Sequence, residues 1–363
     1  TIYTQPVASS DLILNGNGAG QAGLKQVISE RNQADLGADG LGRVAISSPT
    51  ATSVSVAEDA SPSVYGMKLQ SVASSLTGAT VTGPAGTPPA ISVDLGASNP
   101  ADGDTISFTF DLPDGTSETV QLTASSAVPT PAGSFAIGAT PTATAANLNA
   151  ALTSSIGTLA KTSLVAASAI RATHDFFDKP PQRVDVTPPA TLATATAAVN
   201  GTAADTVQWY TGDAGTGSAR ATSTVRVDPS VTVQYGIRAN EDAIRSVMES
   251  VALFAAVTTS PTDPNGAGQI SALNSRVAQN LTVTPGQQNI QDIQSDLANA
   301  QTVMKDATAR QKLTQATMQN LVDQAENVST DEVASQLLAL QTDLQASYQT
   351  TAMLSQLSLV KFL

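Results

Sequence analysis

Cysteine is absent from this 363-residue chain, and histidine and aromatic residues are scarce, with one histidine and 4% aromatics. Without cysteine the chain has no disulfide framework, no thiolate zinc site and no cysteine nucleophile. The single histidine, His174, leaves one possible centre for a Ser-His-Asp triad and excludes histidine-rich metal sites. We therefore expect no enzymatic activity, no cofactor and no metal site.

Basic charge and long apolar runs are also lacking. The chain has 17 basic and 30 acidic residues, and this net charge of −13 repels phosphate backbones, so we expect no nucleic-acid binding. No run of 18 apolar residues is present, so we expect no membrane insertion. The first ten residues lack the basic and apolar segments of a signal peptide. If the protein is secreted, we expect a route that uses no cleaved leader.

Two groups of polar residues are candidates for chemical sites. His174 lies in a Thr-His-Asp-Phe-Phe stretch near prolines, where a loop position beside an aromatic cluster is favoured over metal binding or acid–base chemistry. Asp102, Asp104, Asp111 and Asp114 could offer carboxylates to a cation, but their spacing is more typical of hairpin turns.

Short alternating runs predict strands in the first part of the chain. Helical spacing over 21–35 ends at the turn residues of 37–40, and strand patterns then dominate to about residue 125. The strongest hairpin signal is Asp114-Gly115 between two alternating segments. The expected strands are Val44–Ile46, Val54–Val56, Ile91–Leu95, Thr105–Phe110 and Glu118–Leu122.

The rest of the chain changes from mixed to helical character. Residues 127–142 are expected as a loop, followed by helices at Ala145–Leu152 and Ser163–Ile170. Four prolines in 178–190 exclude a long helix there. Strands are expected within 205–237, and helices over 240–257, 267–281, 287–326 and 330–360.

These patterns predict an α+β fold, with small β-rich outer domains in the middle and long coiled-coil-like helices at the carboxy terminus. The expected divisions are a loop and short helix over 1–42, an outer variable α+β region over 43–239, a helical linker region over 240–285 and two long helices over 286–363. A boundary near 126–142 could divide the outer region into two subdomains.

A heptad pattern runs through 287–326. Nine of eleven residues on its two seams are apolar, and a 3.5-residue repeat held for five heptads indicates a coiled-coil seam. Forty residues make a helix about 60 Å long, which needs a partner along its length. The seams are Ile290, Leu297, Met304, Gln311, Met318 and Ala325, and Ile293, Ala300, Ala307, Thr314 and Leu321.

The last helix is amphipathic and almost uncharged. Ser329 to Glu332 form the pattern of a capping box, and no charged residue occurs between Asp343 and Lys361. Such a helix would be an aggregation hazard in a free monomer, so we expect it to be buried against other copies or a partner. Packing inside its own domain is the usual alternative, but 1–239 offers no heptad helix of matching length. The expected contact residues are Val333, Leu337, Leu340, Leu344, Tyr348, Leu354, Leu357 and Leu359, together with the heptad residues Ile290, Ile293, Leu297, Met304, Met318 and Leu321.

The closing segment, VSTDEVASQLLALQTDLQASYQTTAMLSQLSLVKFL, resembles the carboxy terminus of bacterial flagellins and of their relatives at the hook–filament junction. The segment from Glu30 to Arg43 also looks like the long flagellins of alphaproteobacterial type. The resemblance implies an extracellular subunit of the bacterial flagellum that leaves through the flagellar export channel and polymerises with its terminal helices in the core of the tube. It implies as partners other copies, an export chaperone and cap or junction proteins.

One departure from that family concerns the amino-terminal helices. Flagellins carry a long amino-terminal helical segment that pairs with the carboxy-terminal helices, and this sequence has none. We expect the chain to be a carboxy-terminal portion whose partner helices lie elsewhere. The expected function is a structural filament subunit active in motility. The alternatives are a hook–filament junction protein and a surface adhesin or glycan-binding module in which Trp209 and Tyr210 stack on sugar, although a core role for this pair is favoured.

Overall fold

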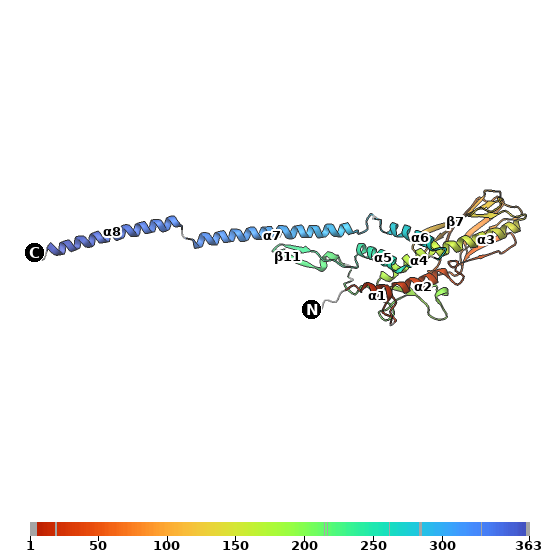
Figure 1. Cartoon of the computed structure of the whole chain (residues 1–363), viewed down its shortest axis with the longest axis horizontal. Helices are drawn as coiled ribbons and strands as arrows, with labels where there is room; N and C mark the ends of the chain where they lie inside the picture. Colours follow the sequence, from red (N-terminus) through yellow and green to blue (C-terminus); the bar gives the residue numbers. More distant parts are fainter. Residues whose placement is uncertain are drawn as a thin grey trace. The chain divides into compact units, whose positions relative to one another are not determined.

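The computed structural model describes residues 6–360 except 19, 214, 216, 261, 283, 284 and 328, and it describes no side chains for 358–360. The fold is mixed α+β, as expected from the sequence. The chain forms two compact units, Thr1–Gly217 with Arg238–Ile290, and Ser218–Ile237 with Gln291–Leu363. We describe each unit by itself (Figure 1).

Two four-stranded sheets form the β-rich part of the first unit. The first sheet is antiparallel, and the second is antiparallel except for the parallel pair β7–β8. In spatial order the first sheet contains β1 (Val44–Ser47), β2 (Ser53–Glu58), β5 (Ala90–Asp94) and β4 (Thr80–Ala85), and the second contains β3 (Lys68–Ser74), β6 (Thr105–Asp111), β7 (Ser117–Ser125) and β8 (Ser134–Ala136).

The hairpin predicted at Asp114-Gly115 is confirmed as the connection between β6 and β7. Its turn chemistry is local, because the Asp114 side chain accepts a hydrogen bond from the Thr116 amide at 3.1 Å and Gly115 takes a positive φ of 84°. Along β6, Ile106, Phe108 and Phe110 alternate into the core. Period-two patterning therefore placed this strand and its buried face from sequence alone.

A continuous helical segment covers the core that the two sheets share. It consists of α3 (Pro141–Leu159), a π-helical turn (Ala160–Leu164) and α4 (Val165–Phe177). The expectation of two separate helices, at 145–152 and 163–170, is wrong, because no proline follows Pro141 in the segment and its one glycine, Gly157, costs only about 1 kcal/mol. The expected loop over 127–142 includes β8 and the start of α3.

Helices pack around a second core in the first unit. They are α1 (Ser10–Asn15), α2 (Leu24–Leu36), α4, α5 (Asp242–Ala256) and α6 (Gly266–Asn280). An aromatic row of Phe176, Phe177, Trp209 and Tyr210 joins them, with neighbouring ring centres 5.0–5.5 Å apart. The short strands β9 (Gln182–Val184) and β10 (Ala198–Asn200) pair beside α2 and α4.

The second unit combines a hairpin with the two carboxy-terminal helices. Strands β11 (Thr224–Asp228) and β12 (Val231–Gln234) are antiparallel, preceded by a short 3-10 turn (Ala219–Thr222). The helices are α7 (Ile290–Glu326) and α8 (Thr330–Val360). Both long helices were predicted from sequence with bounds that differ by at most three residues. Among the described residues, no helix is long and apolar enough to cross a bilayer.

Candidate assembly surface

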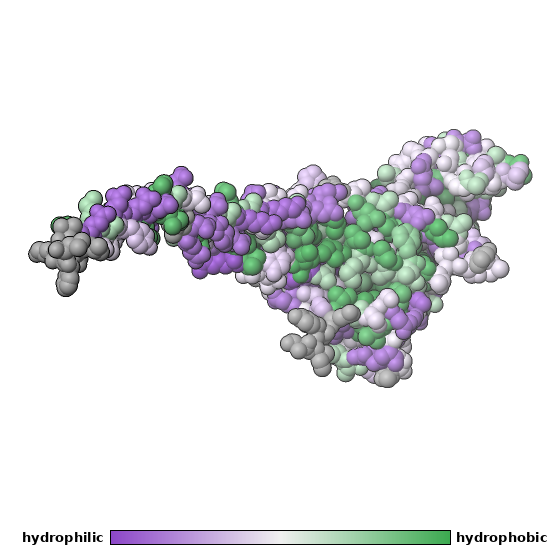
Figure 2. All heavy atoms as spheres, turned by 60° about the vertical axis from the view of Figure 1, so that its left-hand side comes forward, coloured by the Kyte–Doolittle hydropathy of each residue, from purple (hydrophilic) through white to green (hydrophobic). Residues whose placement is uncertain are grey.

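Every described side chain of α8 is exposed to solvent. Its large apolar residues include Leu337, Tyr348 and Leu357, which are 61%, 71% and 70% exposed. Figure 2 shows green apolar residues among purple ones along the helix that ends in grey at the left. The expected contact residues on α8 are exposed by 40% to 71%, whereas the side chain of Leu359 lies outside the described part. The exposed ones are Val333, Leu337, Leu340, Leu344, Tyr348, Leu354 and Leu357.

The first half of α7 is covered along its heptad seams. Ile293, Ala300 and Ala307 are buried and lie seven residues apart. Leu297 and Met304, on the neighbouring seam, are half-buried, and Ile290 at the start of the helix is half-buried as well. The remaining side chains from 291 to 310 are exposed. Burial therefore follows the heptad positions that the sequence indicated, but it arises within this chain and not from the other polypeptide that we expected to cover Ile290, Ile293, Leu297 and Met304.

The hairpin segment 218–237 covers this half of α7. The Arg220 Nε lies 3.8 Å from the Asp296 Oδ2, near the start of the helix. About four turns further on, the Gln311 side chain donates a hydrogen bond of 2.8 Å to the Val227 carbonyl oxygen. The seam residues Ala300 and Ala307 lie between these two contacts. Sequence patterns indicated no heptad helix to pair with α7, and they did not predict the hairpin that covers part of it.

The second half of α7 has no such cover among the described residues. From Gln311 to Glu326 every side chain is exposed, including Leu313 at 70%, Met318 at 61% and Leu321 at 58%. We call residues 291–310 the covered half and residues 311–326 the open half. The open half and α8 together form the candidate assembly surface.

The first unit also contains a buried network of charged residues. The Arg31 guanidinium on α2 bridges Asp35 at 3.0 Å and Asp175 on α4 at 2.7 Å. Asp35 also accepts hydrogen bonds from the Ser168 hydroxyl at 2.7 Å and the Gly66 amide at 2.8 Å. Because the carboxylates are fully paired, the network is suited to locking α2, α4 and the loop before β3 together.

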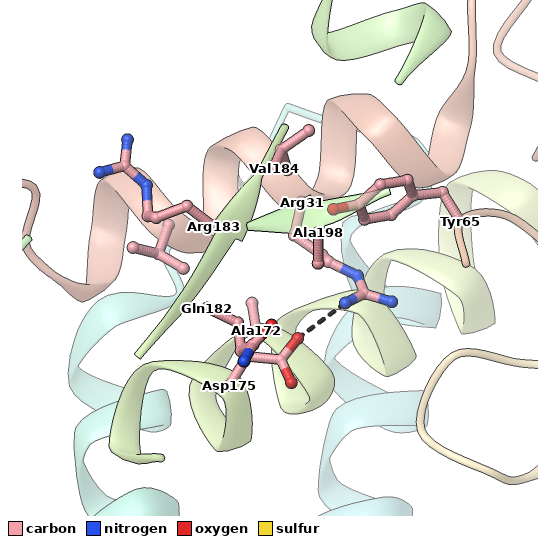
Figure 3. Close-up of a pocket in the computed structure, with 9 residues that line it drawn as sticks. Arg31, Tyr65, Ala172, Asp175, Gln182, Arg183, Val184 and Ala198 are labelled. Carbon is pink, nitrogen blue, oxygen red and sulfur yellow. Dashed lines mark hydrogen bonds and ion pairs between the residues drawn. The ribbon is translucent and has the colours of Figure 1, made fainter. Parts of the chain in front are cut away.

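A small pocket opens beside this network (Figure 3). Its space of about 10 Å³ holds roughly one water molecule, which is too small for a substrate. The Tyr65 ring lies 4.9 Å from the Arg31 guanidinium, and burial raises the pKa of the Tyr65 hydroxyl. We therefore assign the pocket a structural role. Its lining residues are Val27, Arg31, Tyr65, Ala172, Asp175, Gln182, Arg183, Val184 and Ala198.

Of the four aspartates considered as a cation site, Asp111 and Asp114 accept hydrogen bonds within the β6–β7 hairpin, whereas Asp102 and Asp104 accept from residues 24 and 27 positions away in the sequence. Asp102 accepts from the Ser126 amide, Asp104 from the Thr77 amide and Asp111 from the Ser117 hydroxyl. These hydrogen bonds hold the pKa values of Asp102 and Asp104 below the ordinary value. Within the described residues, no group of three His, Cys, Asp or Glu side chains could hold a metal ion.

His174 lies in the last turn of α4, so the expectation of a loop position is wrong, although the aromatic row is adjacent as expected. Its Nδ1 lies 3.6 Å from the Glu249 carboxylate on α5. The nearby Glu249 carboxylate raises the pKa of His174, with a smaller opposing effect of burial. The pair of His174 with Glu249 therefore links α4 to α5 at the surface.

Trp209 and Tyr210 belong to the helical core, as favoured from sequence. They are 4% and 6% exposed, and the Trp209 indole donates a hydrogen bond of 2.8 Å to the Phe177 carbonyl oxygen. A sugar-stacking surface needs an open aromatic face, and neither ring offers one. The residues proposed for the adhesin alternative are therefore occupied by packing.

Comparison of the chain with family models, curated proteins and solved structures finds no match.

Proposed function

We propose that the chain is a structural subunit of the bacterial flagellar filament, which assembles through its carboxy-terminal helices. The observation that carries this proposal is the exposure of every described side chain on the 31-residue helix α8. Exposure of a row of leucines to water is unfavourable, and the described part of its own unit does not bury this row. Contact with other polypeptide supplies the missing cover.

The sequence of α8 supports an assembly contact over a membrane or ligand contact. Between Asp343 and the end of the described helix no residue is charged, so apolar packing can continue over nearly five turns, at about 3.6 residues per turn. Coiled-coil and filament interfaces bury such rows against neighbouring helices. The flagellin-like pattern of the closing segment agrees with this use.

The proposed partners follow from the same surface. Other copies of the chain and amino-terminal flagellin helices outside this sequence would cover α7 and α8, and an export chaperone would shield the helices before assembly. Cap and junction proteins would contact the ends of the polymer. In this proposal the protein is extracellular, and the β-rich part of the first unit faces outward from the filament.

Electron microscopy of the full-length protein tests the proposal. We expect filaments from the intact protein and none from a variant truncated after Asp343, while circular dichroism and Trp209 fluorescence show that the first unit of the truncated variant stays folded. Filaments formed by the truncated variant would refute the role given to 344–360. Isolated rings or short caps in place of filaments would favour the hook–filament junction alternative.

A further inference from the structure

Methionine is the only sulfur-containing residue type in this chain, since cysteine is absent. The sequence holds five methionines, and three of them lie on the long helices α7 and α8. Met318 on the open half of α7 and Met353 on α8 are each 61% exposed, whereas Met67 in the core of the two sheets is fully buried. Met248 on α5 and Met304 on the covered half of α7 are half-buried. The most accessible thioethers are therefore on the candidate assembly surface.

Each exposed methionine belongs to an apolar row. Leu321 and Val322 lie one turn after Met318 and are 58% and 46% exposed, and Leu357 lies one turn after Met353 and is 70% exposed. The stretches 313–322 and 344–357 contain no charged residue. A partner that covers these rows would surround both sulfurs with apolar groups, against which a flexible thioether packs well.

We propose that Met318 and Met353 are sites of reversible oxidation, at which a peroxide-class oxidant converts the thioether to a sulfoxide and thereby blocks assembly. In this step a sulfur lone pair attacks one peroxide oxygen, so a sulfur–oxygen bond forms and the oxygen–oxygen bond breaks. A proton moves to the departing hydroxide, and methionine and hydrogen peroxide give methionine sulfoxide and water. The sulfur is oxidised by two electrons and the peroxide is reduced by two. The inference rests on the proposed assembly and adds a regulation of the same surface.

Exposure selects these two sites in the dilute chain. Peroxide reaches a sulfur on a side chain that is 61% exposed without any opening of the fold, whereas Met67 becomes accessible only when the core of the first unit opens. No cysteine competes for the oxidant. In the proposed filament the cover over the apolar rows also shields both sulfurs, so the oxidation acts on the chain before it assembles.

The sulfoxide changes the chemistry of the row in which it lies. Oxidation turns a flexible apolar side chain into a polar one whose oxygen accepts hydrogen bonds. An apolar partner row offers this oxygen no donor, so burial of the sulfoxide is unfavourable. We expect sulfoxides at both positions to raise the protein concentration needed for filament growth about tenfold or more.

Peroxide treatment of the dilute full-length chain tests the sites. Peptide mass spectrometry follows the addition of oxygen at each methionine over time. We expect Met318 and Met353 to be oxidised at least about tenfold faster than Met67, while Trp209 fluorescence shows that the first unit stays folded. Equal rates at the three methionines would overturn the assignment of the sites.

Filament yield before and after this treatment tests the consequence for assembly. The treated parent protein should lose its filaments, and methionine sulfoxide reductases that act on both sulfoxide epimers should restore them. The double variant Met318→Leu with Met353→Leu should keep the yield of its own untreated sample, whereas the matched control Met248→Leu should lose its yield as the parent does.

The outcomes separate this inference from the proposed function. Full filament yield from the oxidised parent would overturn the inference and leave the proposed function standing. Loss of yield from the oxidised double variant would place the effect at other methionines and would also overturn the inference alone. A parent protein that forms no filaments before treatment would overturn the proposed function as well.

Discussion

The helices α3 and α8 both have large apolar faces, but α3 buries its face within the chain and α8 leaves its face exposed. Both are long and rich in apolar residues, but α3 buries Leu148, Leu152 and Ile156 completely against two sheets, while Leu337 and Leu344 on α8 are 61% and 47% exposed. The difference lies in what the rest of the unit supplies. The sequence pattern of a helix indicates which face should be buried, and the rest of the fold determines which polypeptide buries it.

The covered half and the open half of α7 repeat this contrast inside one helix. The heptad pattern continues through both with Gln311 and Thr314 as its two polar residues, yet the hairpin covers only the part up to Gln311. A continuous seam therefore does not imply one continuous partner.

Among substitutions that compare the buried first unit with the exposed helix α8, we expect the largest loss of stability in the buried charge network. Asp35→Ala should lower the free energy of unfolding of the first unit by about 3–5 kcal/mol, because it leaves the buried Arg31 guanidinium with one carboxylate fewer. Chemical denaturation followed by Trp209 fluorescence measures this. The matched control Asp331→Ala, on exposed α8, should stay within about 0.5 kcal/mol of the parent. Equal losses for the two variants would break the distinction between the regions.

The same substitution in α3 and α8 compares the two helices directly. Leu148→Ala should destabilise the first unit by about 2–5 kcal/mol, since it opens a cavity in a fully buried site. Leu337→Ala should change the stability of the dilute chain by no more than about 0.5 kcal/mol and weaken assembly instead. Urea denaturation by circular dichroism and sedimentation of assembled material provide the two readouts. A large loss of stability from Leu337→Ala in the dilute chain would show an internal partner for α8.

Much of the fold could be predicted from sequence because its signals are local. Alternation along β6, the Asp114-Gly115 turn and the spacing of the two long helices all depend on neighbours in the chain. The features that the sequence did not predict depend on residues far apart in the chain. The ion pair of Arg31 with Asp175 joins residues 144 positions apart, and that of Arg276 with Asp114 joins residues 162 positions apart. No local sequence pattern therefore predicts either pair.

The sequence predicted the apolar surface of the candidate site, but not the division of α7 into a covered half and an open half. Heptad spacing identified Ile293, Ala300 and Ala307 as seam residues, and all three are buried. Nothing local to the strands of 224–234 indicated that they would cover this seam. Whether the remaining residues contact other chains stays a prediction.

Thiol labelling should reveal the division of α7. In the dilute full-length chain, Ala307→Cys, under the hairpin, should react with a thiol reagent several-fold more slowly than Met318→Cys on the open half. Reaction rates followed by mass spectrometry give the ratio. If the two cysteines react at equal rates, the hairpin does not protect the covered half in solution.

The smallest expected effect concerns pH. Because Glu249 raises the pKa of His174, the stabilisation from this pair is complete below the unfolded value near 6.5 and is lost as pH rises through the folded pKa. Glu249→Gln should lower the pKa of His174, which NMR titration of the only histidine measures without overlap. An unchanged pKa in this variant would remove Glu249 as the cause.

The central claim is that the apolar row of α8 becomes covered when the protein assembles. The most direct measurement is the reactivity of a Leu337→Cys variant with a thiol reagent, in the dilute chain and in sedimented filaments. The account predicts fast labelling of the dilute chain and strong protection in the filaments. Equally fast labelling in both states would show that α8 stays bare in the assembly and would contradict the account.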